Sequence, residues 1–141
     1  MFTPLDKQMF VAPQIDVDSV RLAAMQGITT IINNRPDEED YGQPESRDLE
    51  VLAKMLGIDY RHIPVTHAGM SALQIDQMVL ALSQAEGAVL AFCRSGTRST
   101  LLWALARAKM GDKPDELAAK AQAAGYDLTP IRAMLDMLSA K

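Results

Sequence analysis

The sequence has few of the features that mark several common kinds of protein. Its 141 residues include a single cysteine, Cys93, so an internal disulfide, a CxxC pair and a thiolate-rich metal cage are all excluded. Basic residues do not predominate, and the net charge of −4 disfavours a nucleic-acid or anionic-membrane partner. Long apolar runs are missing too, since stretches such as residues 88–92 cannot cross a bilayer, and the first residues do not resemble a targeting segment. We therefore expect a cytoplasmic protein.

The composition is that of an ordinary folded domain. Hydrophobic residues make up 48% and charged residues 23%, and a chain of this length fits one domain over residues 1–141. Short apolar runs that predict strands alternate with longer runs that predict helices. The strands are expected at 10–12, 28–32, 58–65 and 88–92, and the helices at about 16–26, 46–56, 71–84, 100–110, 114–124 and from 129 onward. This alternation predicts an α/β domain of three layers, with a mostly parallel sheet of four or five strands and helices on both faces.

The polar segment from Cys93 to Ser99 follows a predicted buried strand and precedes a predicted helix. Backbone N–H groups converge at such a turn, and the helix dipole is positive there, so a thiolate at Cys93 would be stabilised. Gly96 permits a tight curl of the backbone, and Ser99 is placed to hydrogen-bond the sulfur or to cap the helix. The expected anion-binding residues of this segment are Arg94, Ser95, Gly96, Thr97, Arg98 and Ser99.

A lone cysteine is often an inert core residue, and the segment would then be only a turn between a strand and a helix. Two arginines beside that cysteine are costly unless they face an anion, however. We therefore expect Cys93 to be a nucleophile and Arg98, with its fixed fork of donors, to clamp a small anionic substrate.

A long acidic segment, residues 35–45, lies between a predicted strand and a predicted helix. It is either a solvated loop or a segment that overhangs the active site, because ligands of open α/β sheets bind beyond the carboxyl ends of the strands. In the second case Arg35 and Asp37 become candidates for substrate binding. Asp37 or Asp40 could then serve as an acid, provided that the segment folds over Cys93.

Four stretches of the sequence carry a resemblance to known proteins. Cys93–Ser99 resembles the active-site loop of cysteine-dependent phosphatases and of rhodanese-type sulfurtransferases. Together with residues 31–37, 43–44 and 60–65, it is similar to the bacterial phosphatase-like domain family of beta-lactamase hydrolase-like proteins, which also occurs fused to persulfide dioxygenases. The resemblance covers most of residues 8–110. It implies a phosphatase-like α/β fold, with Cys93 as the nucleophile and Arg98 as the anion clamp.

Two departures from the phosphatase pattern favour sulfur chemistry. Cysteine phosphatases usually place five residues between the cysteine and the arginine, whereas this chain has four, and Phe92 replaces the usual histidine. The position expected for the aspartate that acts as general acid in a phosphatase holds His67. A histidine can act as an acid near neutral pH, but His67 is as readily an exposed loop residue. The sequence therefore predicts a sulfurtransferase that carries a persulfide on Cys93, from thiosulfate or a persulfide donor to a thiol acceptor.

Two other functions remain open. One is a phosphatase that acts on a phosphate ester through a phosphocysteine, and the other is a non-catalytic module that binds anions. We expect no cofactor, and a metal site made of His62, His67 and Cys93 is disfavoured because their spacing fits no ligand pattern. His62 is expected to be structural, and a homo-oligomer is compatible with the sequence.

Overall fold

Five strands form a mostly parallel sheet in the computed structural model, which describes residues 2–66 and 68–140. They are β1 (Thr3–Pro4), β2 (Met9–Ala12), β3 (Ile28–Asn33), β4 (Asp59–His62) and β5 (Ala88–Phe92). Their order across the sheet is β1-β2-β5-β3-β4. All neighbouring pairs are parallel except β1 with β2, which forms an antiparallel edge. The predicted α/β class and strand number are confirmed.

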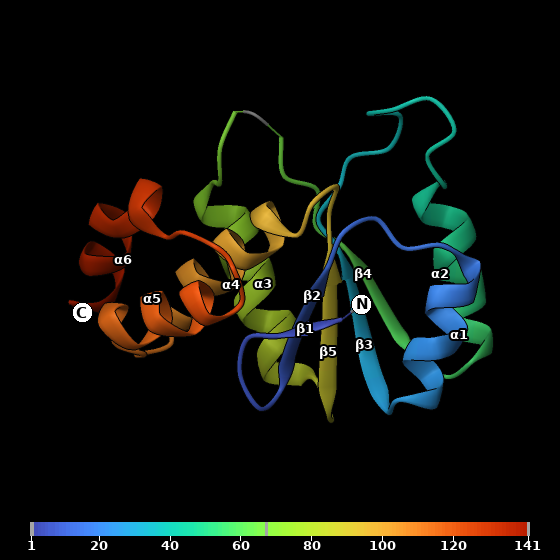
Figure 1. The fold of residues 1–141 in the computed structure, drawn as a ribbon, viewed down its shortest axis with the longest axis horizontal. Helices are drawn as coiled ribbons and strands as arrows, with labels where there is room; N and C mark the ends of the chain where they lie inside the picture. The colour runs from blue at the N-terminus through green and yellow to red at the C-terminus, as the bar shows by residue number, and fades with distance from the viewer. Residues whose placement is uncertain (1, 67, 141) are drawn as a thin grey trace.

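Helices cover both faces of this sheet (Figure 1). On one face lie α1 (Val17–Met25) and α2 (Ser46–Met55). On the other lie α3 (Ala72–Gln84), α4 (Thr97–Lys109), α5 (Pro114–Ala123) and α6 (Arg132–Ser139), the last preceded by a 3₁₀ turn, Thr129–Ile131. Among the described residues, no helix has the length and apolar character needed to span a membrane.

The central strands supply both faces of the core because their side chains alternate. Ile31 and Leu90 pack with α1 and α2, whereas Ile32 and Val89 pack with the helices of the opposite face. Trp103 of α4 is fully buried in that second cluster. Two packed faces fix the position of β5 in the middle of the sheet, and its carboxyl end carries Cys93.

Several boundaries differ from those that the sequence predicts. Helix α4 begins at Thr97, three residues before the predicted start, because its polar first turn looks like a loop in the sequence. Strand β4 ends at His62 rather than Val65, and β1 was not predicted. The N-cap position of α2 is Glu45, one residue before the predicted start. Helix α3 begins with a capping box formed by Ser71 and Gln74.

Candidate active site

Cys93 lies directly after β5 and is fully buried. Gly96 has a φ of +91°, a conformation that side chains with a Cβ rarely adopt, and forms the N-cap of α4. The turn directs the Gly96 N–H to the sulfur, with a distance of 3.1 Å between the nitrogen and Cys93 Sγ. The first turn of α4 follows at once, and its N–H groups lack carbonyl partners within the helix. The sulfur is therefore held by a backbone donor beside a helix N-terminus, as the sequence predicts.

Arg98 occupies the first turn of α4, and only part of its donor set is used. Nη1 donates to Glu39 Oε2 and to the Val65 carbonyl oxygen, both at 2.7 Å, and Nη2 donates to Glu39 Oε1 at 2.8 Å. The pKa of Arg98 is raised, first by the hydrogen bonds to Glu39 and then by the charge of the nearby Cys93 thiolate. A guanidinium has five N–H donors. Nε–H and one Nη2–H therefore have no acceptor oxygen among the described residues, and they form one edge of the group.

The acidic segment does overhang this turn. Its anchor is Arg35, whose side chain is only 4% exposed and donates to Glu39 at 2.9 Å, to Gln14 at 2.9 Å and to Asp40 at 2.6 Å. Arg94, with a side chain that is 69% exposed, pairs with Asp40 at 3.3 Å. Each of its three nitrogens makes a hydrogen bond within the protein, so Arg35 holds the segment in place, and its binding of the substrate stays a prediction.

Glu39 was not identified from the sequence, where it is one carboxylate in an acidic run. The structure places its side chain between Arg35 and Arg98, which lie 63 residues apart along the chain. These partners, Arg98 above all, lower the pKa of Glu39 from 4.5 to about 2, so that Glu39 is a carboxylate at neutral pH. A sequence pattern could not reveal this role, because it depends on a contact between distant loops.

Asp37 has a different role from the predicted one. Its Oδ1 accepts a hydrogen bond from the Ser46 backbone N–H at 2.8 Å, so the carboxylate caps the N-terminus of α2. Asp37 is thus engaged as a helix cap, and neither the predicted binding role nor the role of an acid is supported.

The remaining predicted residues differ from one another in their surroundings. The side chains of Ser95 and Thr97 bond to each other, with 3.0 Å between their hydroxyl oxygens. The Ser99 hydroxyl is buried and has no hydrogen-bond partner among the described residues, so the predicted bond to sulfur and the predicted cap are absent. His67 lies outside the described residues. His62 is 2.8 Å from the Arg35 carbonyl oxygen through Nε2, a structural contact as predicted.

A hollow of about 480 Å³ is lined in part by Arg98. Arg94, Arg98 and Glu39 form its charged side, and Met70 and Leu101 give it apolar surface. The rest of its lining is Val65, Thr66 and Gly69. An anionic group held by Arg98 could therefore carry an apolar substituent that rests on Met70 and Leu101.

A sheet covered on both faces, with a cysteine and an arginine at the turn between its central strand and a helix, defines a cysteine-phosphatase-like domain. The family model for the "Beta-lactamase hydrolase-like protein, phosphatase-like domain" matches residues 2–110, and the chain belongs to this family.

Individual proteins agree with this assignment. A beta-lactamase hydrolase-like protein of Xylella fastidiosa is 33% identical over 125 residues, which are 88% of this chain but only 29% of that protein. A solved structure from Neisseria meningitidis, described as a candidate phosphatase, is 36% identical with a TM-score of 0.82 and 96% coverage of both chains. The kinase associated phosphatase, solved with serine at its catalytic site cysteine, shares the fold at 16% identity, with a TM-score of 0.75 and coverage of 99% and 94%.

The prediction of a sulfurtransferase is wrong. The family and the solved structure from Neisseria meningitidis are phosphatase-like, and they favour the alternative in which a phosphate ester is the substrate. The interval of four residues between Cys93 and Arg98 was interpreted as favouring sulfur chemistry. In the structure α4 already begins at Thr97, so the helix itself carries Arg98 to the site. The short interval therefore does not distinguish sulfur transfer from phosphoryl transfer, and the predicted thiol acceptor has no support.

Proposed function

We propose that this domain hydrolyses phosphate monoesters through a phosphocysteine on Cys93. The observation that carries the proposal is the Gly96 N–H on the Cys93 sulfur at the N-terminus of α4, with Arg98 in the first turn of the same helix. A thiolate in this environment is an activated nucleophile, and the N–H groups around it suit the oxygens of a phosphoryl group.

In the proposed reaction the Cys93 thiolate attacks phosphorus, a bond between sulfur and phosphorus forms, and the bond to the leaving oxygen breaks with its electron pair. Water then attacks the phosphocysteine, which releases inorganic phosphate and regenerates the thiolate. The Nε–H and Nη2–H edge of Arg98 stabilises the charge on the phosphoryl oxygens in both steps.

The part of the site that the structure describes favours esters whose leaving group departs without strong assistance. A poor alkoxide leaving group needs an acid, and three carboxylates of the acidic segment are engaged elsewhere, Asp37 as a helix cap, Glu39 with two arginines, and Asp40 with Arg35 and Arg94. An aryl leaving group departs more readily as an anion and takes its proton from water. Its ring also fits the apolar surface of Met70 and Leu101.

The experiment is an assay of aryl phosphate hydrolysis, combined with mass spectrometry of the protein after rapid acid quenching. We expect turnover and a phosphoryl adduct on Cys93 that both disappear in Cys93→Ser. Arg98→Lys keeps the charge but loses the planar set of N–H donors, so kcat/KM should fall by about two orders of magnitude. Arg21→Lys is the matched control, because the Arg21 side chain is exposed on α1, pairs with Asp18 and does not line the hollow. Turnover that persists in Cys93→Ser would refute the proposal, as would binding of phosphate without any turnover.

The chain spans about 29% of the length of the Xylella fastidiosa relative, so its reaction could be one part of a larger protein's activity. A small anionic substrate is the partner that the site supports.

A further inference from the structure

The peptide unit between Ser95 and Gly96 is hydrogen-bonded at both of its ends. The Tyr126 hydroxyl is 3.1 Å from the Ser95 carbonyl oxygen, and the Gly96 nitrogen is 3.1 Å from Cys93 Sγ. No cis peptide bond occurs among the described residues, so the C=O and N–H of this unit point in opposite directions. Tyr126 and the sulfur of Cys93 are therefore hydrogen-bonded to opposite ends of the same rigid peptide unit.

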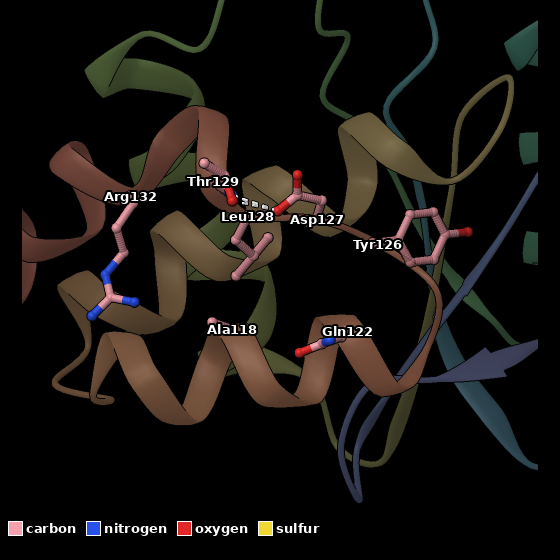
Figure 2. A pocket seen from close by; sticks show the side chains of 7 residues that line it. All are labelled: Ala118, Gln122, Tyr126, Asp127, Leu128, Thr129 and Arg132. Carbon is pink, nitrogen blue, oxygen red and sulfur yellow. Dashed lines mark hydrogen bonds between the residues drawn. The ribbon is translucent and has the colours of Figure 1, made fainter.

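Tyr126 reaches this peptide from a distant part of the chain. It follows α5, and its backbone N–H donates to the Ala121 carbonyl oxygen at 2.9 Å, which ties it to the end of that helix. Figure 2 shows its hydroxyl directed away from Gln122 and Leu128, which line the hollow between α5 and the start of α6. Tyr126 also lies outside residues 2–110, which the family model matches.

The fit between Tyr126 and the turn is close. A Cβ added to Gly96 would lie 2.2 Å from the Tyr126 hydroxyl oxygen, well inside van der Waals contact. Partial burial raises the pKa of Tyr126, and the Cys93 charge raises it further, so the phenol stays protonated at neutral pH. Because a carbonyl oxygen can only accept, the hydroxyl must be the donor.

We propose that Tyr126 is a positioning residue for the nucleophile: its hydroxyl orients the Ser95–Gly96 peptide so that the Gly96 N–H stabilises the Cys93 thiolate. A hydrogen bond to the carbonyl also polarises the amide, which makes its N–H a stronger donor to sulfur. The role in catalysis rests on the proposed function, whereas the effect on the thiolate does not.

The test is Tyr126→Phe, which keeps the ring and removes only the hydroxyl. The rate of Cys93 alkylation by iodoacetamide is measured against pH, a readout that needs no substrate. Loss of one neutral hydrogen bond should move the midpoint of this profile upward by roughly 0.3 to 1 pH unit. The kcat/KM for an aryl phosphate should fall by roughly three- to tenfold at neutral pH, with much of the loss recovered at higher pH.

Tyr60→Phe is the matched control, because the Tyr60 hydroxyl is also bonded, to Asn33 and Ser46, but does not contact the Cys93 turn. It should lower the midpoint of thermal unfolding and leave the alkylation profile in place. An unchanged profile in Tyr126→Phe would overturn the inference, as would equal displacement in both variants. If the profile shifts in Tyr126→Phe while no variant hydrolyses any aryl phosphate, the positioning role stands and the proposed function fails.

Discussion

The Glu39 carboxylate lies across the end of the Arg98 guanidinium, with both of its oxygens bonded to the two Nη nitrogens. Such a pair either blocks the arginine or orients it. The donor count favours orientation, since Nε–H and one Nη2–H have no acceptor oxygen among the described residues. Glu39 and the Val65 carbonyl oxygen bind the Nη1 group and one Nη2–H, which leaves the edge formed by Nε–H and the other Nη2–H for an oxyanion.

Replacing Glu39 by glutamine should therefore weaken substrate binding. The amide retains one acceptor but loses the charge, so Arg98 is held less firmly. Because the ion pair is partly exposed, we expect KM for an aryl phosphate to rise by only about three- to tenfold, with a smaller change in kcat. Steady-state kinetics would measure both constants.

The neighbouring Glu38→Gln serves as the control, because Glu38 is exposed and no contact ties it to Arg98. A KM that decreases in Glu39→Gln would show that the carboxylate blocks the site, contrary to the orienting role.

The same ion pair predicts a dependence of stability on acid pH. The pKa of Glu39 in the folded protein is about 2, below its ordinary value of 4.5, so the unfolded chain binds more protons between these values. The stabilisation by Glu39 is therefore complete above about pH 4.5 and is lost as the pH falls toward 2. Urea unfolding from pH 6 to 2.5 should show that the free energies of unfolding of the original protein and of Glu39→Gln converge as the pH falls. A difference between the two free energies that stays constant with pH would contradict the lowered pKa of Glu39.

The fold class could be predicted from the sequence because short apolar runs mark the strands and longer apolar patterns mark the helices. The run Ala88–Phe92 is apolar at every position, as a strand buried on both faces requires, and Ser71 with Gln74 marks a helix start without ambiguity. The nucleophile turn could also be located, because Cys93, Gly96 and Arg98 are close in sequence and their chemistry is local.

The surroundings of that turn could not be predicted in the same way. Glu39 reaches Arg98 across 59 residues, and Tyr126 reaches Ser95 across 31, so neither contact leaves a local pattern. The sequence left open whether the acidic segment is a solvated loop or overhangs the site, and it could not indicate which carboxylate makes the contact. Asp37 and Asp40 were the candidates, and in the structure Asp37 caps α2 whereas Asp40 pairs with Arg35 and Arg94.

Gly96→Ala should damage the site more than its backbone strain alone would do. A residue with a Cβ at φ +91° is strained by about 1–2 kcal/mol, and this Cβ would also collide with the Tyr126 hydroxyl. Gly57→Ala is the matched control, because Gly57 has a φ of +79° with nothing within 4 Å of an added Cβ. Both variants should lose stability to backbone strain, measured by urea unfolding, and Gly96→Ala should lose more because of this collision. Only Gly96→Ala should also lose more than about tenfold in kcat/KM, and equal activity in the two variants would contradict the close fit.

A pair of substitutions at Asp37 can distinguish the helix cap seen in the structure from the predicted role as an acid. Asn is as good a helix cap as Asp, so Asp37→Asn should keep both stability and activity, whereas Asp37→Ala should lose about 0.5–2 kcal/mol of stability. An acid in catalysis would behave differently, because the amide cannot donate a proton to the leaving oxygen. In that case Asp37→Asn would lose activity, most severely on substrates with poor leaving groups. Kinetics of Asp37→Asn on a series of aryl phosphates, with unfolding of both variants, would therefore decide between cap and acid.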